Sequence, residues 1–409
     1  MSKYQNAHLT FKGNLGVGRH GWLRLTPAYS IGLVREHVAA LPPGSVVTDP
    51  FSGTGTTALA AVEHGLCGQA LDVNPFLIWL GNVKTRRYQE MDLRSALDAL
   101  PVITSSAREV CGLSDLWQPR LANIERWWSH SRLEALKAIR WVLDQRQSDA
   151  VRDLLDVAFC RTLIDVSNAA FNHQSMSFKN VAPDVARLFE VDEASAVIEQ
   201  YSREASDILI TAAAGLPGRA AILLGDSRDM QAPGLEPADL LFTSPPYANR
   251  MSYIRELRPY MYWLHFLDLA SDAGELDWTA IGGTWGTATS RLLSWSSNEP
   301  LPIQNEIDSV CEGIALDGGK NGPLLSAYVH KYFVDMWEHF QAAYKHVKSG
   351  GRATYIIGNS TFYGHVVPAE QWYREMLLEA GFHSATVEAI RKRNSKKELF
   401  EFDVSAMRP

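Results

Sequence analysis

Residues 45–75 read SVVTDPFSGTGTTALAAVEHGLCGQALDVNP, and this stretch decides the expected fold. A short β-branched run ends at Asp49 and meets a glycine turn, after which residues 56–65 show an alanine-rich helical pattern. A second apolar run covers residues 68–71, with Asp72 at its carboxyl end. The pattern predicts a β-turn-α-β unit. An α/β fold follows from it, with an open, doubly wound, mostly parallel sheet that binds its ligand across the strand ends.

Strand patterns resume later in the chain, each as an apolar run that ends in polar or turn residues. These runs are AAILLGDSRDM at residues 220–230, ADLLFTSPPY at residues 238–247 and GRATYIIGNS at residues 351–360. Near the C-terminus, residues 383–390 and 398–406 are strand-like and flank the basic run RKRNSKK. They predict an antiparallel hairpin with a basic tip at one edge of the sheet.

Two segments interrupt this pattern. Residues 85–217 have helical periodicity with hardly a strand signal, which predicts a helical insertion. Residues 270–323 are rich in Gly, Ser and Trp and have weak periodicity, which predicts a functional loop or a small subdomain. The remaining residues, 1–84, 218–269 and 324–409, are predicted to form the main domain.

Composition excludes several classes of protein. With 409 residues, 46% hydrophobic and 21% charged, the chain has enough apolar residues for a large core and a smaller satellite. A net charge of -7 excludes a uniformly basic nucleic-acid coat but allows a local basic face. No long uncharged apolar run is present, and the start of the chain has no export-like apolar stretch, so we expect a soluble cytoplasmic protein. The cysteines are too few and too widely spaced for a disulfide scaffold or a metal knuckle, and we expect no metal site; they are Cys67, Cys111, Cys160 and Cys311.

The first chemical motif is the glycine turn, Asp49-Pro50-Phe51-Ser52-Gly53-Thr54-Gly55-Thr56-Thr57. Its two glycines let the backbone turn tightly and approach a ligand at a helix N-terminus. Gly53, Gly55 and Ala58 also match a dinucleotide-binding fingerprint, so a nicotinamide or flavin enzyme has to be considered. A tight turn that binds no ligand is equally compatible with the glycine spacing alone.

The second motif is Thr243-Ser244-Pro245-Pro246-Tyr247, which follows the apolar run at residues 238–242. With the glycine turn, it resembles the amino-methyltransferases of the TSPPY type, which use S-adenosylmethionine to methylate an exocyclic nitrogen of a DNA base. The resemblance covers residues 23–84 and about 221 to the C-terminus, apart from the loop after Ala270. It implies a Rossmann-like class I methyltransferase fold, duplex DNA as the partner and base flipping. A proline-stopped strand followed by a core tyrosine is the structural alternative.

The chemistry of a nucleobase amine explains why such a motif is needed. Its lone pair is delocalised into the ring, so acceptors that bind its hydrogens make the nitrogen a better nucleophile. Ser244 Oγ and the Pro245 carbonyl are suitable acceptors, because the Pro245-Pro246 pair holds an extended backbone. Tyr247 offers a flat face for a flipped base, worth about 1–3 kcal/mol in stacking. No metal is required, and most of the rate is expected from in-line positioning.

The resemblance also implies a set of cofactor contacts. Asp72 is expected to accept the ribose hydroxyls, Asp226 and Ser227 to lie near the adenine amine, and Pro27 and Ser30 to lie beside the methionine end. The glycine turn is expected to hold the methionine part, through Asp49, Phe51, Ser52, Gly53, Gly55, Thr56 and Thr57. Asp72 and Asp226 could instead be helix caps or turn aspartates.

Basic residues near the predicted strand ends are candidates for DNA phosphate contacts. The main candidates are Arg250, Arg255, Arg391 and Arg393, and a further set after the second strand is Lys84, Arg86 and Arg87. A solvated charge run is the alternative for each set. The insertion at residues 85–217 resembles the place where some family members keep a target-recognition region, and residues 270–323 are a second possible DNA contact.

The target base is inferred from Ser244. Serine at this position resembles the cytosine-N4 branch of the family, whereas aspartate is usual in the adenine-N6 branch. A hydroxyl is both donor and acceptor, so N6-adenine stays an alternative. RNA guanine-N2 methylation, protein amide methylation and a non-catalytic DNA-binding subunit also stay open. A restriction or defence-system partner is possible.

Overall fold

The computed structural model describes residues 9–23, 29–170, 177–178, 192–249, 252–284, 286–297, 299–393 and 398–409. Two predicted site residues, Pro27 and Arg250, lie outside these ranges, and their roles stay predictions.

The β-turn-α-β unit is confirmed. Strand β1 covers Val46–Asp49, helix α2 covers Thr56–Glu63 and strand β2 covers Cys67–Asp72, parallel to β1. Helix α3, Pro75–Thr85, follows directly. The Asn74 side chain caps it by accepting from Phe76 N at 3.0 Å, and proline occupies its first turn, where no backbone donor is needed.

The central sheet has seven strands in the order β10-β11-β7-β6-β1-β2-β5. The other five are β5 Arg219–Leu224, β6 Ala238–Thr243, β7 Val347–Gly358, β10 His383–Lys392 and β11 Phe400–Met407. Among the described strands of this sheet, β11 runs opposite to the rest and is antiparallel to both β7 and β10, and β10 and β11 form the predicted C-terminal hairpin. Counted along the chain, the strands of this sheet lie in the order 3-2-1-4-5-7-6, which is the Rossmann-like class I methyltransferase fold.

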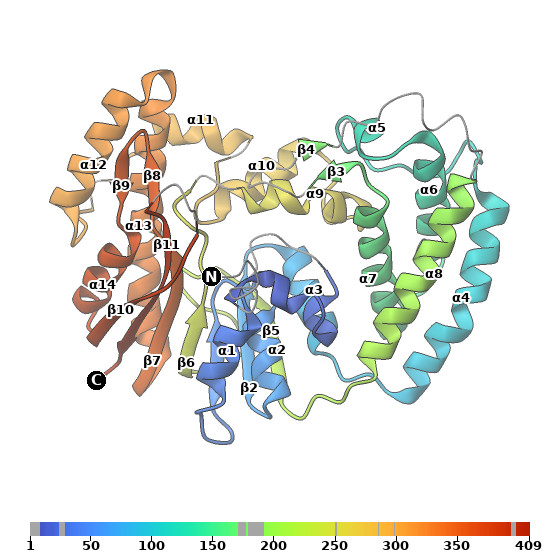
Figure 1. The fold of residues 1–409 in the computed structure, drawn as a ribbon, viewed down its shortest axis with the longest axis horizontal. Coiled ribbons are helices and arrows are strands. Elements are labelled where there is room, and N and C mark those ends of the chain that lie inside the picture. Colours follow the sequence, from blue (N-terminus) through green and yellow to red (C-terminus); the bar gives the residue numbers. More distant parts are fainter. Residues whose placement is uncertain are drawn as a thin grey trace.

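Helices cover both faces of the sheet, as Figure 1 shows. Strand β6 alternates between them: Leu240 and Phe242 join the core with α1 (Ile31–Val38) and α2, whereas Leu241 joins the core with α13 (Gly322–His346). Helix α14, Ala369–Glu379, packs on the same side as α13. Both sheet faces are therefore apolar, which is typical of a doubly wound fold.

The described residues between 85 and 217 form a helical bundle, drawn on the right of Figure 1. Its helices are α4 Glu90–Val110, α5 Ile124–Trp127, α6 His130–Asp144, α7 Ala150–Asp165 and α8 Glu193–Ala212. A short ribbon of β3 (Ala169–Ala170) and β4 (Ser177–Phe178) is an addition that the sequence pattern did not predict, because two-residue strands leave no periodicity.

One arginine joins the entry and the exit of this bundle. The Arg19 guanidinium donates to the Lys84 and Arg86 carbonyls at 3.0 and 2.6 Å, and to the Ala212 and Ala214 carbonyls at 2.6 and 2.9 Å. Arg19 is buried, so these charge-assisted bonds are protected from water. It belongs to a 3₁₀ helix, Gly18–Gly21, which follows another at Phe11–Asn14.

Helix α9, Tyr253–Trp263, runs from the Thr-Ser-Pro-Pro-Tyr motif into the bundle. Its last residue, Trp263, is fully buried against the rings of Trp128, Phe159 and Trp117, with centroid distances of 5.8, 5.6 and 6.1 Å. The helix that begins beside the motif is therefore anchored in the core of the insertion.

Residues 270–323, expected to be a loop or a small subdomain, are largely helical. They form α10 Ala270–Thr279, α11 Thr287–Ser294, α12 Gln304–Asp317 and a 3₁₀ turn at Gly319–Asn321 that leads into α13. These helices are short and interrupted by glycines and serines, so the periodicity of the segment is weak. A small hairpin of β8 (Ser360–Phe362) and β9 (His365–Val367) completes the fold.

Within the part of the chain that the structure describes, no helix is long and apolar enough to cross a membrane, and no group of side chains is suited to hold a metal ion. All four cysteines are free thiols.

We expect Trp263→Ala to lower the free energy of unfolding by about 3–5 kcal/mol, because it removes a fully buried ring from the contact between α9 and the bundle. Chemical denaturation measures this loss. The matched control is Trp141→Ala, since Trp141 is 40% exposed and its loss should cost about 0.5 kcal/mol or less. Equal losses in both variants would contradict the anchoring role.

Candidate active site

A pocket lies at the carboxyl ends of β1, β2, β5 and β6, and its empty space, counted together with the open solvent at its entrance, is about 1070 Å³. Its wall is completed by the first turns of α9 and by residues 277–283, which end α10 and follow it. The predicted site residues that line it are Phe51, Ser52, Gly53, Asp72, Asp226, Ser227, Ser244 and Pro246. The glycine turn and the Thr-Ser-Pro-Pro-Tyr motif, far apart in sequence, therefore share one pocket.

The rest of the glycine turn supports the pocket from behind. Gly55 has a φ of +71°, a left-handed conformation that glycine adopts without steric cost, and it starts helix α2. Thr56 and Thr57 are buried; Thr56 Oγ1 lies 2.8 Å from Thr54 Oγ1, and Thr57 Oγ1 donates to the Phe242 carbonyl at 3.3 Å. Gly55, Thr56 and Thr57 do not line the pocket, and they hold its floor in shape.

Asp49 is fully buried and joins three parts of the site. Its carboxylate accepts from Thr243 Oγ1 at 2.6 Å, from Tyr29 Oη at 2.9 Å and from Phe51 N at 3.1 Å. Tyr29 Oη also lies in contact with Thr57 Oγ1. Burial raises the pKa of Asp49 to about 6, although these hydrogen bonds act in the opposite direction. The residue therefore acts as a brace between the glycine turn and the residue before Ser244.

Asp72 reaches the pocket from the end of β2. Its carboxylate accepts from Gly53 N at 3.2 Å and from Asn74 N at 2.9 Å. Burial raises its pKa to about 7, with the two backbone donors partly compensating. Asp72 therefore both lines the pocket and serves as a turn aspartate.

Asp226 lines the pocket, but its carboxylate is already engaged. Arg228 Nη2 donates to Asp226 Oδ2 at 2.6 Å, and Arg228 Nε lies 3.0 and 3.1 Å from the two carboxylate oxygens. Burial opposes ionisation, yet the hydrogen bonds from Arg228 lower the pKa of Asp226. Arg228 also donates to the Thr279 carbonyl at 2.8 Å and so ties the C-terminal end of α10 to the turn after β5.

The Thr-Ser-Pro-Pro-Tyr motif leaves β6 in an irregular conformation. Ser244 and Pro246 line the pocket. The Pro246 carbonyl accepts from Tyr332 Oη at 2.6 Å, and the Pro245 side chain is buried. Tyr247 does not line the pocket: its Oη donates to Glu401 Oε1 at 2.7 Å. Burial, with the neighbouring Glu401 carboxylate, raises the pKa of Tyr247 well above its usual value, so its hydroxyl stays protonated.

The structure corrects one candidate among the basic residues after β2, Lys84, and gives the other two internal contacts beside which DNA contact stays a prediction. Lys84, a candidate phosphate contact, is buried and donates to the Thr54 carbonyl at 2.7 Å behind the glycine turn. Arg86 forms an ion pair with Asp153 at 2.6 Å, and Arg87 donates to carbonyls at residues 217–218. These three side chains hold the start of the insertion.

The remaining arginine candidates differ from one another. Arg255 is exposed on the first turn of α9, next to residues that line the pocket. Arg391 forms an ion pair with Glu401, with 2.6 Å between Nε and Oε2. The Arg393 guanidinium lies over the ring of Tyr247, 5.2 Å from its centroid. DNA contact by all three stays a prediction, and for the last two it must be compatible with these internal contacts.

Two polar residues of the pocket, Tyr29 and Asp277, are among the lining residues that the sequence patterns did not reveal. Tyr29 lines the pocket, whereas its predicted neighbour Ser30 caps α1 by accepting from Gly32 N at 3.0 Å. Asp277 is buried in the wall and accepts from Ser252 Oγ at 2.6 Å. Sequence proximity to Ser30 was the available signal for Tyr29. Asp277 carried none, because only the packing of α10 against α9 brings it to the pocket.

Comparison with known proteins shows distant sequence similarity to two methyltransferases. No protein-family model matches the chain. Type II methyltransferase M.MvaI of Kocuria varians is 22% identical over 251 residues, which cover 58% of this chain and 54% of that protein. Type II methyltransferase M.BsoBI of Geobacillus stearothermophilus is 20% identical over an alignment of 469 residues, which covers 98% of this chain and 86% of that protein. The chain is a distant homologue of type II methyltransferases. It spans about half the length of the first of these relatives.

Among solved structures, the rRNA methyltransferase aviRa from Streptomyces viridochromogenes aligns over 99% of this chain and 94% of its own, at 11% identity and a TM-score of 0.30. The fold is assigned from the sheet order.

We expect Thr243→Val to lower the free energy of unfolding by about 1–3 kcal/mol at pH 8, because it removes a donor from the buried Asp49 carboxylate. The loss should be smaller at pH 4.5, below the Asp49 pKa of about 6, where the carboxyl is protonated. Denaturation at both pH values tests this. Thr386→Val, at an exposed position of β10, is the control and should change little at either pH.

Proposed function

We propose that the protein is an S-adenosylmethionine-dependent DNA amino-methyltransferase that methylates N4 of cytosine in duplex DNA after the base is flipped out of the helix. The observation that carries the proposal is the single pocket shared by the glycine turn after β1 and by Ser244 and Pro246 after β6. A methyl donor and a target amine must meet in one dry site, and this pocket supplies two adjoining walls of different chemistry.

The cofactor wall fits S-adenosylmethionine. Asp72 lines the pocket beside the glycine turn and is a partly exposed carboxylate that would accept from ribose hydroxyls. Phe51, Ser52 and Gly53 would hold the methionine part, and Ser227 would lie near the adenine. When bound, the cofactor supplies a methyl group on a sulfonium, which is a good leaving group. Because Arg228 holds the Asp226 carboxylate, we assign Asp226 to shaping the adenine end of the pocket.

The acceptor wall orients the amine. Ser244 Oγ and the Pro245 carbonyl would accept the two amine hydrogens and localise the lone pair on the nitrogen. A base that stacks on Tyr247 must use the ring face that Arg393 leaves open. Once methylated, the cationic nitrogen is acidic enough to release its proton to water.

Ser244 favours cytosine, with N6-adenine as the alternative, since a hydroxyl can serve either amine. Arg255 is exposed on α9 beside residues that line the pocket and is a candidate for DNA phosphate contact together with Arg250, and the helical insertion is the candidate for target recognition. Both relatives are type II methyltransferases, and we include a restriction partner in the proposal on that ground.

Incubation with S-adenosylmethionine and unmethylated bacterial DNA, followed by nucleoside mass spectrometry, tests the activity. We expect N4-methylcytosine, and a loss of about 100-fold or more in turnover for Ser244→Ala with cofactor affinity little changed. N6-methyladenine would keep the mechanism and correct the base. Tight cofactor binding with no modified DNA base would refute the proposal and favour RNA, a protein amide or a non-catalytic role.

Cofactor affinity should depend on pH through Asp72. Ribose hydroxyls donate to the ionised carboxylate, so binding should strengthen as the pH rises through the Asp72 pKa of about 7 and weaken below it. Asp72→Asn should weaken binding about 10- to 100-fold at pH 8 and flatten this dependence, as calorimetry between pH 6 and 8 would measure. Asp115→Asn, at an exposed position of the insertion, is the control. An unchanged pH profile in Asp72→Asn would contradict the assignment.

A further inference from the structure

The C-terminal hairpin reaches the Thr-Ser-Pro-Pro-Tyr motif because of its direction. Strand β11 is antiparallel, so its first residues lie at the carboxyl edge of the parallel strands, where the pocket is. Glu401, the second residue of β11, pairs with Gly358 at the end of β7. The strand that follows the basic tip thus returns directly to the edge of the sheet that carries the motif.

Glu401 is 5% exposed and makes two kinds of contact. Its Oε1 accepts from Tyr247 Oη at 2.7 Å. Arg391, its cross-strand partner on β10, donates from Nε to Oε2 at 2.6 Å and from Nη2 to Oε1 at 3.2 Å. Both carboxylate oxygens are therefore bound, and the acceptor of the tyrosine hydroxyl is fixed in place by an ion pair.

The ring of Tyr247 is held on a second side by Arg393. Its guanidinium lies 5.2 Å from the ring centroid, within the range of a cation–π contact. Arg393 Nε donates to the Phe400 carbonyl at 3.0 Å, and Nη2 donates to the Asn359 carbonyl. Gly358 makes room for it, since a Cβ there would lie 2.5 Å from Arg393 Cζ.

We propose that Glu401 is a positioning residue for the target base: through the Tyr247 hydroxyl it fixes the plane of the ring, and Arg391 in turn fixes Glu401. This inference rests on the proposed function. A buried tyrosine hydroxyl needs a hydrogen-bond partner. Without one, the ring can rotate until the hydroxyl reaches water. A flipped base can stack on the Tyr247 ring in one orientation of that ring. Because the contacts fix this orientation before the base arrives, no further conformational entropy of the ring is lost on binding.

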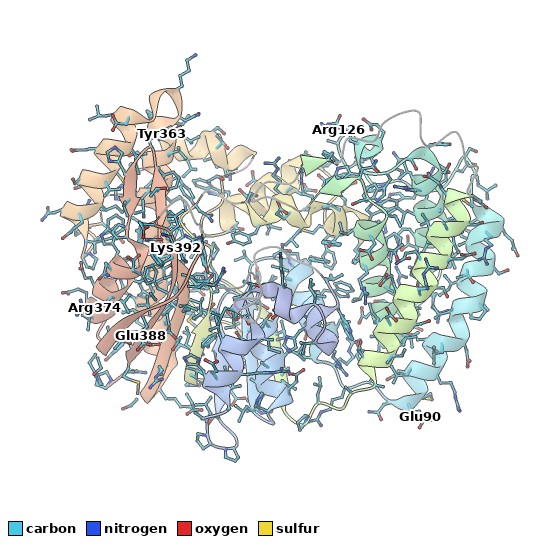
Figure 2. All side chains as sticks on the ribbon, in the orientation of Figure 1. Glu90, Arg126, Tyr363, Arg374, Glu388 and Lys392 are labelled. Atoms are coloured by element: carbon cyan, nitrogen blue, oxygen red, sulfur yellow. The ribbon has the colours of Figure 1, made fainter. Side chains whose placement is uncertain are left out.

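Glu388 provides a matched control on the same hairpin. It lies on β10, four residues before Lys392, and its carboxylate is exposed; both residues are labelled in Figure 2. Glu401→Ala should slow single-turnover methyl transfer about 10- to 100-fold while the cofactor dissociation constant changes less than about twofold. Glu401→Gln keeps an acceptor oxygen and should recover much of the rate. Glu388→Ala should match the wild type.

A double-mutant cycle with Tyr247→Phe tests whether Glu401 acts through the hydroxyl. We expect Glu401→Ala to have less than about a twofold further effect when it is combined with Tyr247→Phe. If the rate losses of Glu401→Ala and Tyr247→Phe multiply in the double variant, the inference is overturned. It is also overturned if Glu401→Ala lowers cofactor affinity and rate equally. If Glu401→Ala does not fold, Tyr247→Phe alone is the second variant: it removes the hydroxyl through which Glu401 would act, and an unchanged rate would count against the inference.

Failure of this inference is distinguishable from failure of the proposed function. A wild-type protein that methylates no DNA base removes the function and the positioning role together. An active wild type in which Glu401 and Tyr247 show no coupling removes the positioning role alone.

Discussion

The buried carboxylate of Asp49 is the constraint on which the site depends. It is the last residue of β1, and it binds Thr243 at the end of β6, Tyr29 from the N-terminal segment and the backbone of Phe51 in the glycine turn. A carboxylate taken out of water is costly unless its oxygens are hydrogen-bonded, so the three donors must be present together. Two strand ends and the segment before α1 are thereby held in one arrangement around the pocket.

The pocket also connects two helical parts of the molecule, the insertion at residues 85–217 and the helices at residues 270–323. Helix α9 lines it with its first turns and buries Trp263 in the insertion, and the segment after α10 closes it while Arg228 holds the Thr279 carbonyl. This arrangement gives the helical bundle a direct physical connection to the proposed chemistry.

Several basic side chains near the strand ends make internal contacts that their sequence position does not reveal. Lys84 and Arg86 follow β2 and look available for phosphates, yet they are used internally, with a backbone carbonyl and with Asp153. Arg391 and Arg393 likewise contact Glu401 and Tyr247. Helix ends and strand ends converge at this edge of the sheet and expose carbonyl and carboxylate acceptors to long cationic side chains. The number of these acceptors depends on the tertiary structure, so the sequence alone does not reveal it.

The sequence by itself determined the β-turn-α-β unit, the further strands at Ala238 and His383 and the two motifs, because strand and helix periods and glycine turns are local properties. It also placed Asp72 and Ser244 at strand ends, and parallel strands bring such ends to one edge. Only the tertiary structure decided that Asp49 braces the turn, that Arg228 engages Asp226, and that Asp277 and Glu401 approach the site. Those contacts join residues far apart in the chain, and they depend on the order and direction of strands and on helix packing, which no local pattern encodes.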